Sequence, residues 1–179
     1  AFEQIRPAVS HGGAALLKLA FNFDEQHPDF KRLKLRLLDI YLNNISNLTT
    51  VFNGIDELLE LFNKKNILWG IVTNKPAWLT DPLMQQMGYS KKAAAIVSGD
   101  TTHKSKPHPE PLFHACRKMN CQPSDCLYIG DAERDIIAGN AAGMTTLTAL
   151  FGYIETGDSP EHWGADAMIK HPAEIENFL

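Results

Sequence analysis

The sequence predicts an α/β fold, a doubly wound parallel sheet with a small helical unit in front of it. Apolar runs that fit buried parallel strands occur at residues 67–72, 94–98, 126–131, 145–150 and 167–169. Helical patterns separate these runs, and alternating strands and helices are typical of doubly wound sheets. The first 50 residues contain no strand pattern. We therefore expect a helical unit over residues 1–50 and an α/β core over residues 51–179.

Each element of the prediction has its own pattern. In the helical unit, Leu33, Leu37, Ile40 and Tyr41 recur at helical spacing and predict one apolar face. Helices of the core are expected over residues 79–87, 109–119, 135–142 and 172–179. Ligands of such sheets bind at the carboxyl ends of the strands, so polar residues directly after the strands are the candidate site.

Composition narrows the function classes. Apolar residues make up 44% of the 179 residues, and the net charge is −4 without a long basic run. This balance argues against a nucleic-acid or membrane-surface partner, and no apolar run approaches the ~20 residues that cross a bilayer. Cys116, Cys121 and Cys126 are an odd number without metal-ligand spacing. They predict reduced thiols in a cytoplasmic protein rather than a disulfide.

The first polar motif follows the strand at 67–72 and begins with Thr73 and Asn74. The Thr73 hydroxyl and the Asn74 backbone N–H are placed to donate hydrogen bonds to phosphate oxygens. For this motif alone, the more ordinary interpretation is a polar turn in which Asn74 caps the next helix.

The second motif is Lys106, followed by Pro107 and Pro109. The prolines stiffen the approach to a helix and fix the backbone of the lysine. Lys106 can then direct a permanent cation at a transferring phosphoryl group. A solvated lysine in a proline turn is an equal alternative for this motif alone.

The third motif is Gly130-Asp131 at the end of a strand, with Asp135 about one helical turn later. Mg²⁺ prefers oxygen ligands and often takes only one or two carboxylates. Asp131 fits a direct ligand, and Asp135 fits an acceptor for metal-bound water. The alternative, acidic residues at the start of a capped helix, is credible for Asp135. Together the three motifs supply donors, a cation and a metal site around one anion, which is what phosphoryl transfer needs.

In their order, these motifs resemble motifs two, three and four of the haloacid dehalogenase phosphatases. The similarity extends over the whole chain, since residues 52–59 resemble the segment that leads from the helical cap of these enzymes into their core, and residues 138–144 resemble the helix and turn after motif four. Within this superfamily the chain is most similar to the bacterial phosphoglycolate phosphatases. Residues 152–154 and 162–166 resemble the N-acetylmuramic acid 6-phosphate phosphatases in that group.

The resemblance implies a cytoplasmic, Mg²⁺-dependent hydrolase of small phosphate monoesters such as 2-phosphoglycolate, working through an aspartyl-phosphate. N-acetylmuramic acid 6-phosphate is the alternative substrate. Motif one of the family is Asp-x-Asp-Gly-Thr at the end of the first core strand, and this sequence contains no Asp-x-Asp. We therefore expect that strand and its nucleophile to lie upstream of Ala1. Without them the chain is expected to be inactive, binding phosphate or Mg²⁺ weakly, and its incomplete sheet could form a homodimer instead of a monomer.

The resemblance also implies a substrate-selecting cap loop. Arg6, Ser10, His11 and Gly12 match the loop of the family's cap that covers the active site. The glycine permits close backbone approach to a ligand. His11 is a candidate to bind a substrate carboxylate or hydroxyl, and a surface loop histidine is an equally good interpretation.

Overall fold

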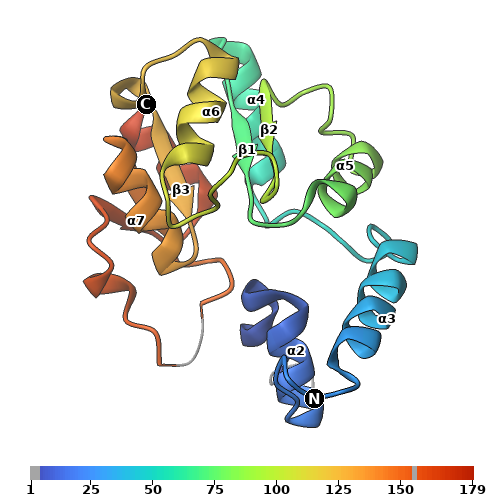
Figure 1. Cartoon of the computed structure of the whole chain (residues 1–179). Coiled ribbons are helices and arrows are strands. Elements are labelled where there is room, and N and C mark those ends of the chain that lie inside the picture. The colour runs from blue at the N-terminus through green and yellow to red at the C-terminus, as the bar shows by residue number, and fades with distance from the viewer. Residues whose placement is uncertain (1–4, 155–156) are drawn as a thin grey trace.

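A computed structural model of the chain describes residues 5–154 and 157–179 (Figure 1). The strands are β1 (Gly70–Val72), β2 (Ala95–Val97), β3 (Leu127–Gly130), β4 (Thr145–Ala149) and β5 (Ala167–Ile169). The α-helices are α2 (Gly12–Phe21), α3 (Phe30–Asn43), α4 (Ile55–Lys65), α5 (Ala77–Gln86), α6 (Glu110–Met119) and α7 (Glu133–Ala142). Short 3-10 helices are η1 (Pro7–His11), η2 (Pro123–Asp125), η3 (Pro160–His162) and η4 (Pro172–Phe178). The predicted α/β class with parallel strands is confirmed.

The strands form two parallel sheets, β1-β2 and β3-β4-β5. Gly70 of β1 is in register with Ala95 of β2, and Gly130 of β3 with Thr148 of β4. Among the described strands, β1 and β3 each pair along one edge only. Each sheet therefore ends in a strand with an open edge.

Helices cover the sheets and bury their apolar side chains. Helices α6 and α7 pack together through Leu112, Ala138 and Ala142. On β4 and β5, Leu147 and Ile169 are 0% and 1% exposed and pack against α4. Strand β2 is an apolar run that suits a buried parallel strand, whereas β4 buries Thr146 and Thr148 on either side of Leu147.

The N-terminal helices stand apart from the sheets in Figure 1 and connect to them through the segment after α3. Helix α2 packs on α3, and Ile45, in the segment that follows α3, is buried against α5. The absence of strands from this region is confirmed for residues 5–50. The predicted apolar face holds in part, because Leu33 and Leu37 are half-buried while Ile40 is 48% exposed.

Two elements differ from the sequence prediction by more than two residues or in helix type. The predicted strand at 67–72 is ordered as a strand only from Gly70, because the Ile67 N–H still caps the end of α4 through the carbonyl of Phe62. The predicted C-terminal helix is a 3-10 helix, opened by a capping box between His171 and Glu174. Neither difference moves a polar motif away from a strand end.

Candidate active site

The backbone of Lys106 is held by the side chain of Asn74. Asn74 Nδ2 donates to the Lys106 carbonyl at 2.9 Å, and its Oδ1 accepts from the Lys106 N–H at 3.1 Å. This pair of bonds ties the loop after β2 to the loop after β1. Asn74 therefore positions the lysine with its side chain, and the phosphate contact predicted for it would use its backbone N–H.

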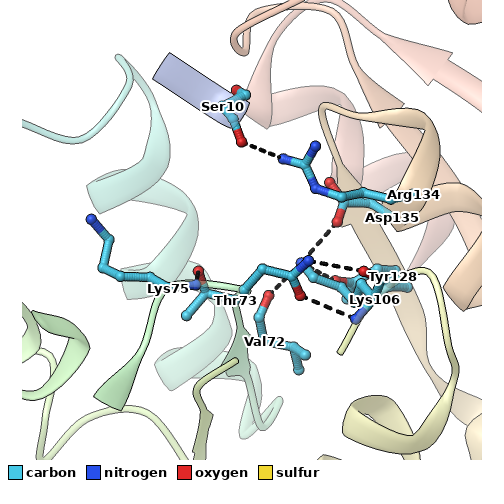
Figure 2. A network of polar contacts seen from close by, with 9 residues as sticks. Ser10, Val72, Thr73, Lys75, Lys106, Tyr128, Arg134 and Asp135 are labelled. Carbon is cyan, nitrogen blue, oxygen red and sulfur yellow. Dashed lines mark hydrogen bonds and ion pairs between the residues drawn. The ribbon is translucent and has the colours of Figure 1, made fainter. Parts of the chain in front are cut away.

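The ammonium group of Lys106 lies where β1, β3 and α7 meet (Figure 2). Its Nζ donates to the Val72 carbonyl at 2.7 Å and to the Tyr128 hydroxyl at 3.0 Å. It also lies 2.8 Å from Asp135 Oδ1, with the two side chains 8% and 6% exposed. The angles of this last contact are not those of a hydrogen bond, so charge attraction carries it. The interpretation of Lys106 as a solvated lysine is wrong, because the side chain is buried and paired.

Tyr128 is a neutral partner in this cluster. Burial raises the pKa of the Tyr128 hydroxyl well above its usual range, and the negative charge of Asp135 raises it further. The phenol therefore stays protonated, and Asp135 supplies the charge that balances Lys106. The sequence analysis missed Tyr128, whose apolar strand position resembles that of any packing residue.

The two aspartates of the third motif are each packed against a glycine. A Cβ added to Gly130 would lie 2.2 Å from the Cβ of Asp135, and one added to Gly152 would lie 2.2 Å from the Cβ of Asp131. Asp131 Oδ2 accepts a hydrogen bond from the Tyr153 N–H at 2.8 Å. Gly152, which follows β4, was not predicted as a site residue, although it fixes where Asp131 can lie.

Thr73 stands directly after β1. Its N–H donates to the Val97 carbonyl at 2.9 Å, which extends the pairing of β1 with β2. Its Oγ1 accepts from the Lys75 N–H at 3.1 Å, so the hydroxyl hydrogen can still be donated elsewhere. Lys75 points away from Lys106 (Figure 2). Its Nζ donates to the Tyr41 hydroxyl of α3 at 2.6 Å.

Part of the predicted cap loop contacts the core loops beside the aspartates. Arg134 Nη2 donates to the Ser10 carbonyl at 2.9 Å (Figure 2). Arg6 donates to the Gly152 carbonyl at 3.3 Å, and its guanidinium lies 4.7 Å from the centre of the Tyr153 ring. The structure thus brings Arg6 and Ser10 to the loops that carry Asp131.

The other two cap-loop candidates lie at the surface. His11 and Gly12 are exposed. Gly12 has φ 76°, and a Cβ built on it would have no neighbour within 4 Å. The Gly12 N–H donates to the Val9 carbonyl, and the space that a side chain would occupy is open among the described residues.

The residues at the end of β3 fit a magnesium ion. Asp131 has one carboxylate oxygen fixed by the Tyr153 N–H, and its Oδ1 has no hydrogen bond among the described residues. A carboxylate oxygen held in a loop after a strand is the hard ligand that Mg²⁺ takes. Asp135 belongs to the same loop-helix segment, with one oxygen paired to Lys106.

A cavity of about 500 Å³ lies elsewhere, beside the segment that leads into α4. Residues 49–54 line it together with Tyr89 and Lys92. None of the candidate residues lines this cavity, so the chemistry of Lys106 and the aspartates, rather than the hollow, identifies the site.

Comparisons with known proteins show the family of the chain. The pattern of the haloacid dehalogenase-like hydrolases matches residues 10–149. The N-acetylmuramic acid 6-phosphate phosphatase of Pseudomonas aeruginosa is 39% identical over 177 residues, which cover 99% of this chain and 78% of that protein. The phosphoglycolate phosphatase of Xanthomonas campestris pv. campestris is 36% identical over 175 residues, covering 96% and 77%.

Solved structures show the same fold. A crystal structure described as that of a predicted phosphoglycolate phosphatase from Haemophilus somnus aligns with a TM-score of 0.86 at 23% identity, covering 99% of this chain and 82% of that one. The chain belongs to the haloacid dehalogenase-like hydrolases, and it is a phosphoric monoester hydrolase of that family.

Proposed function

We propose that this protein is a Mg²⁺-dependent phosphatase of small phosphorylated metabolites in the cytoplasm, with 2-phosphoglycolate as one candidate substrate. The observation that carries the proposal is the buried Lys106 ammonium, fixed at 2.7 Å from the carbonyl that ends β1 and 3.0 Å from a side chain on β3. A cation held in a dry site at strand ends stabilises negative charge far more than one in water.

The residues after β1 and β2 bind and orient the phosphoryl group in this proposal. Thr73 donates its hydroxyl hydrogen to one phosphate oxygen, and the Asn74 N–H donates to another. Lys106 balances the charge that develops in the transition state, while Asn74 holds its backbone in place. Tyr128 and Asp135 fix the direction of the ammonium.

Asp131 and Asp135 are the proposed magnesium residues. Asp131 binds the ion through its carboxylate, and Asp135 orients the surrounding water. When bound, the ion would supply positive charge at the phosphate oxygens. The contact of Asp131 with Gly152 and Tyr153 fixes its carboxylate before any ion arrives.

The nucleophile in this proposal is an aspartate upstream of Ala1. The 179 residues contain no Asp-x-Asp. Strands β1 and β3 each have an edge that no described strand occupies. The backbone N–H and C=O groups along such an edge need hydrogen-bond partners. A further strand between them would end beside Lys106, which contacts both β1 and β3. That position suits an in-line attack on a phosphoryl group held by Thr73 and Lys106.

The substrate has two candidates, and the relatives favour both. N-acetylmuramic acid 6-phosphate is the second candidate, because the relatives at 39% identity are phosphatases of that compound. Both compounds carry a carboxylate in addition to the phosphate. We propose that residues 1–50 form a cap over a core of residues 51–179. In that arrangement the guanidinium groups of Arg6 and Arg134, at the cap–core contact, recognise the carboxylate.

A substrate panel tests this function. The natural protein, including any upstream residues, would be assayed with Mg²⁺ against 2-phosphoglycolate, N-acetylmuramic acid 6-phosphate and p-nitrophenyl phosphate. N-acetylglucosamine 6-phosphate, which lacks the carboxylate, is the matched control. We expect the highest kcat/KM for one of the two carboxylate-bearing substrates. Equal kcat/KM with and without the carboxylate would contradict the proposed recognition.

A second experiment tests whether the nucleophile lies outside residues 1–179. Residues 1–179 expressed alone are expected to give essentially no turnover of p-nitrophenyl phosphate, acting at most as a weak binder of phosphate or Mg²⁺. Phosphorylated aspartate trapped on an upstream residue would support the proposal. Full activity of residues 1–179 would show that the nucleophile lies within them.

A further inference from the structure

The three cysteines of the chain converge in space. Cys116 lies in α6, Cys121 follows that helix, and Cys126 directly precedes β3. The sulfur of Cys126 is 3.5 Å from that of Cys121 and 4.0 Å from that of Cys116, and all three lie within 4.8 Å of one another. The sequence prediction of cysteines without a metal-ligand arrangement therefore misses a feature that only the fold creates.

The backbone around the cysteines is fixed by hydrogen bonds. Helix α6 ends at Asn120, whose left-handed φ of 53° reverses the chain. The Cys121 N–H then donates to the Cys116 carbonyl at 3.1 Å, and the Cys126 N–H donates to the Pro123 carbonyl at 3.0 Å. The Cys126 carbonyl in turn accepts from the Thr145 N–H of β4 at 3.2 Å. The three thiols are thus presented by a rigid turn rather than by a loose loop.

The sulfur separations match those of a thiolate metal centre. With a Zn–S bond of about 2.3 Å, two sulfurs of a tetrahedral site lie roughly 3.8 Å apart, and those of a planar three-sulfur site about 4.0 Å apart. The measured 3.5 and 4.0 Å lie around these values. The thiols of Cys121 and Cys126 now make weak hydrogen bonds to the carbonyls of Cys116 and Gln122. Small rotations of these side chains would bring the sulfur separations to the values of a metal site.

The site would be chemically distinct from the magnesium residues. Cys126 precedes β3 and Asp131 follows it. Five residues of strand at about 3.3 Å each put them roughly 16 Å apart, at opposite ends of β3. Thiolates select soft ions, whereas Mg²⁺ takes carboxylates and water. In the described part of the chain, no histidine or carboxylate joins the three sulfurs in a group whose ligand atoms all lie within 4.8 Å of one another.

We propose that Cys116, Cys121 and Cys126 bind one soft, thiophilic metal ion such as Zn²⁺, with a fourth position left to solvent. Binding exchanges three thiol protons for the metal, so three protons are released for each ion bound. The ion ties the end of α6 to the start of β3. Cys116 is 5% exposed, while Cys121 and Cys126 are half-buried, which leaves an entry path for the ion on one side.

The test uses Cd²⁺ as an optical probe and Zn²⁺ in competition with a chromophoric chelator. Chelator-treated protein, kept reduced with a phosphine, would be titrated while thiolate-to-cadmium charge transfer is followed in the ultraviolet. We expect one ion per chain, a raised Tm, and protection of all three thiols from alkylation. An excess of Mg²⁺ should not compete.

Variants separate a site from incidental thiol chemistry. Cys121→Ser and Cys126→Ser should each weaken Zn²⁺ binding more than about a hundredfold, because each removes one of three ligands. His114→Ala, on the same helix as Cys116, is the control and should bind as the wild type does. Circular dichroism of the metal-free variants establishes that they fold. No charge-transfer band, or equal affinity in the wild type and Cys121→Ser, would overturn the proposal.

Discussion

At the scale of single residues, the site depends on a buried charge pair. Lys106 and Asp135 lie 2.8 Å apart with side chains 8% and 6% exposed. Burying two charges is expensive, and the cost is recovered only when the partners meet each other and further polar groups. Lys106 meets that condition through Val72 and Tyr128. A buried ion pair of this kind adds little to the stability of a fold, which favours a role for this pair in the chemistry of the site.

Breaking this pair should separate stability from catalysis. Lys106→Met leaves Asp135 charged and unpaired, so we expect a loss of about 3–5 kcal/mol in the free energy of unfolding. Activity should fall at least about a hundredfold, as on removal of other groups that stabilise transition-state charge. The measurements are urea unfolding and kcat of the natural protein.

The double variant Lys106→Met/Asp135→Asn is the control for the charge pair. It removes both charges, so it should recover much of the lost stability while remaining inactive. A double variant as unstable as Lys106→Met would show that charge pairing is not what stabilises this position.

The raised pKa of Tyr128 predicts how stability and activity depend on pH at alkaline values. Its pKa is raised well above the usual range near 10 by burial and by Asp135. The folded state therefore retains this proton where the unfolded state loses it. The stabilisation is complete below pH 10 and declines as the pH rises further. Consequently any alkaline decline of kcat below pH 10 should persist unchanged in Tyr128→Phe. Disappearance of that limb in the variant would identify Tyr128 as the titrating group.

Gly152 is a position at which the site leaves no room for a side chain. A Cβ there would lie 2.5 Å from Asp131 Oδ2 as well as 2.2 Å from its Cβ. Gly152→Ala should therefore displace Asp131 and weaken the apparent affinity for Mg²⁺ in the activity assay, with a smaller effect on p-nitrophenyl phosphate binding. An unchanged Mg²⁺ dependence would mean that the loop after β4 moves at no cost to Asp131.

At the scale of elements, contacts made by Ser10 and Arg6 join the N-terminal helices to the core beside the site, and two of them are hydrogen bonds from an arginine. One runs from Arg134, at the start of α7, to the Ser10 carbonyl in η1. The other runs from Arg6 to the loop after β4. Because Arg134 directly precedes Asp135, the position of the helical unit is tied to the loop that carries the aspartates.

Removing the first contact should affect substrate binding more than chemistry. A hydrogen bond from a charged donor contributes about 1.5–3 kcal/mol. We expect Arg134→Ala to raise KM for the natural substrate about tenfold or more, with a smaller change for p-nitrophenyl phosphate. Arg36→Ala is the matched control, since Arg36 is an exposed arginine of α3 paired only locally with Asp39. Equal changes in the two variants would contradict a role for the Arg134–Ser10 contact.

The sequence predicted the elements well where a single pattern decides them. The runs at 126–131 and 145–150 became β3 and β4 within about one residue at each end. Thr73, Asp131 and Asp135 were predicted because each follows a strand or begins a helix, and Lys106 because prolines fix its backbone before a helix. Gly152 and Tyr128 were missed, since their importance comes from contacts across the fold with residues 21 and 22 positions away. The convergence of the cysteines was missed for a different reason: their spacing of five residues matches no metal-ligand motif, and the turn after α6 is what brings their sulfurs together.

At the scale of the whole molecule, each of the two sheets has a strand edge with free backbone groups that a further strand could pair with. Strands β1 and β3 are each hydrogen-bonded on one side among the described residues. Exposed edges of this kind promote association with other chains. We expect a protein that fills these two edges with an additional strand to stay monomeric, and one that leaves them open to dimerise.

Amide hydrogen exchange tests this. In the natural protein, the amides of residues 70–72 and 127–130 should be among the slowest to exchange if a strand lies between the sheets. In residues 1–179 expressed alone, the same amides should exchange faster, and size-exclusion chromatography should detect a dimer. The amides of β4, which is paired on both sides in the structure, serve as the internal control. Identical protection in both proteins would contradict an inserted strand.

The junction at Lys106 ties activity to the cooperativity of folding. Its ammonium is satisfied by a carbonyl from one sheet, a phenol from the other and a carboxylate from α7. None of these partners lies within twenty residues of it in the chain, so no local fragment can assemble them. The Lys106 ammonium reaches its functional position only after both sheets and α7 have docked. Partial unfolding of any one of them removes a partner of the ammonium and abolishes activity. Turnover is consequently a near all-or-none reporter of the native state, and damage at a distant helix registers as lost activity before the core itself has melted.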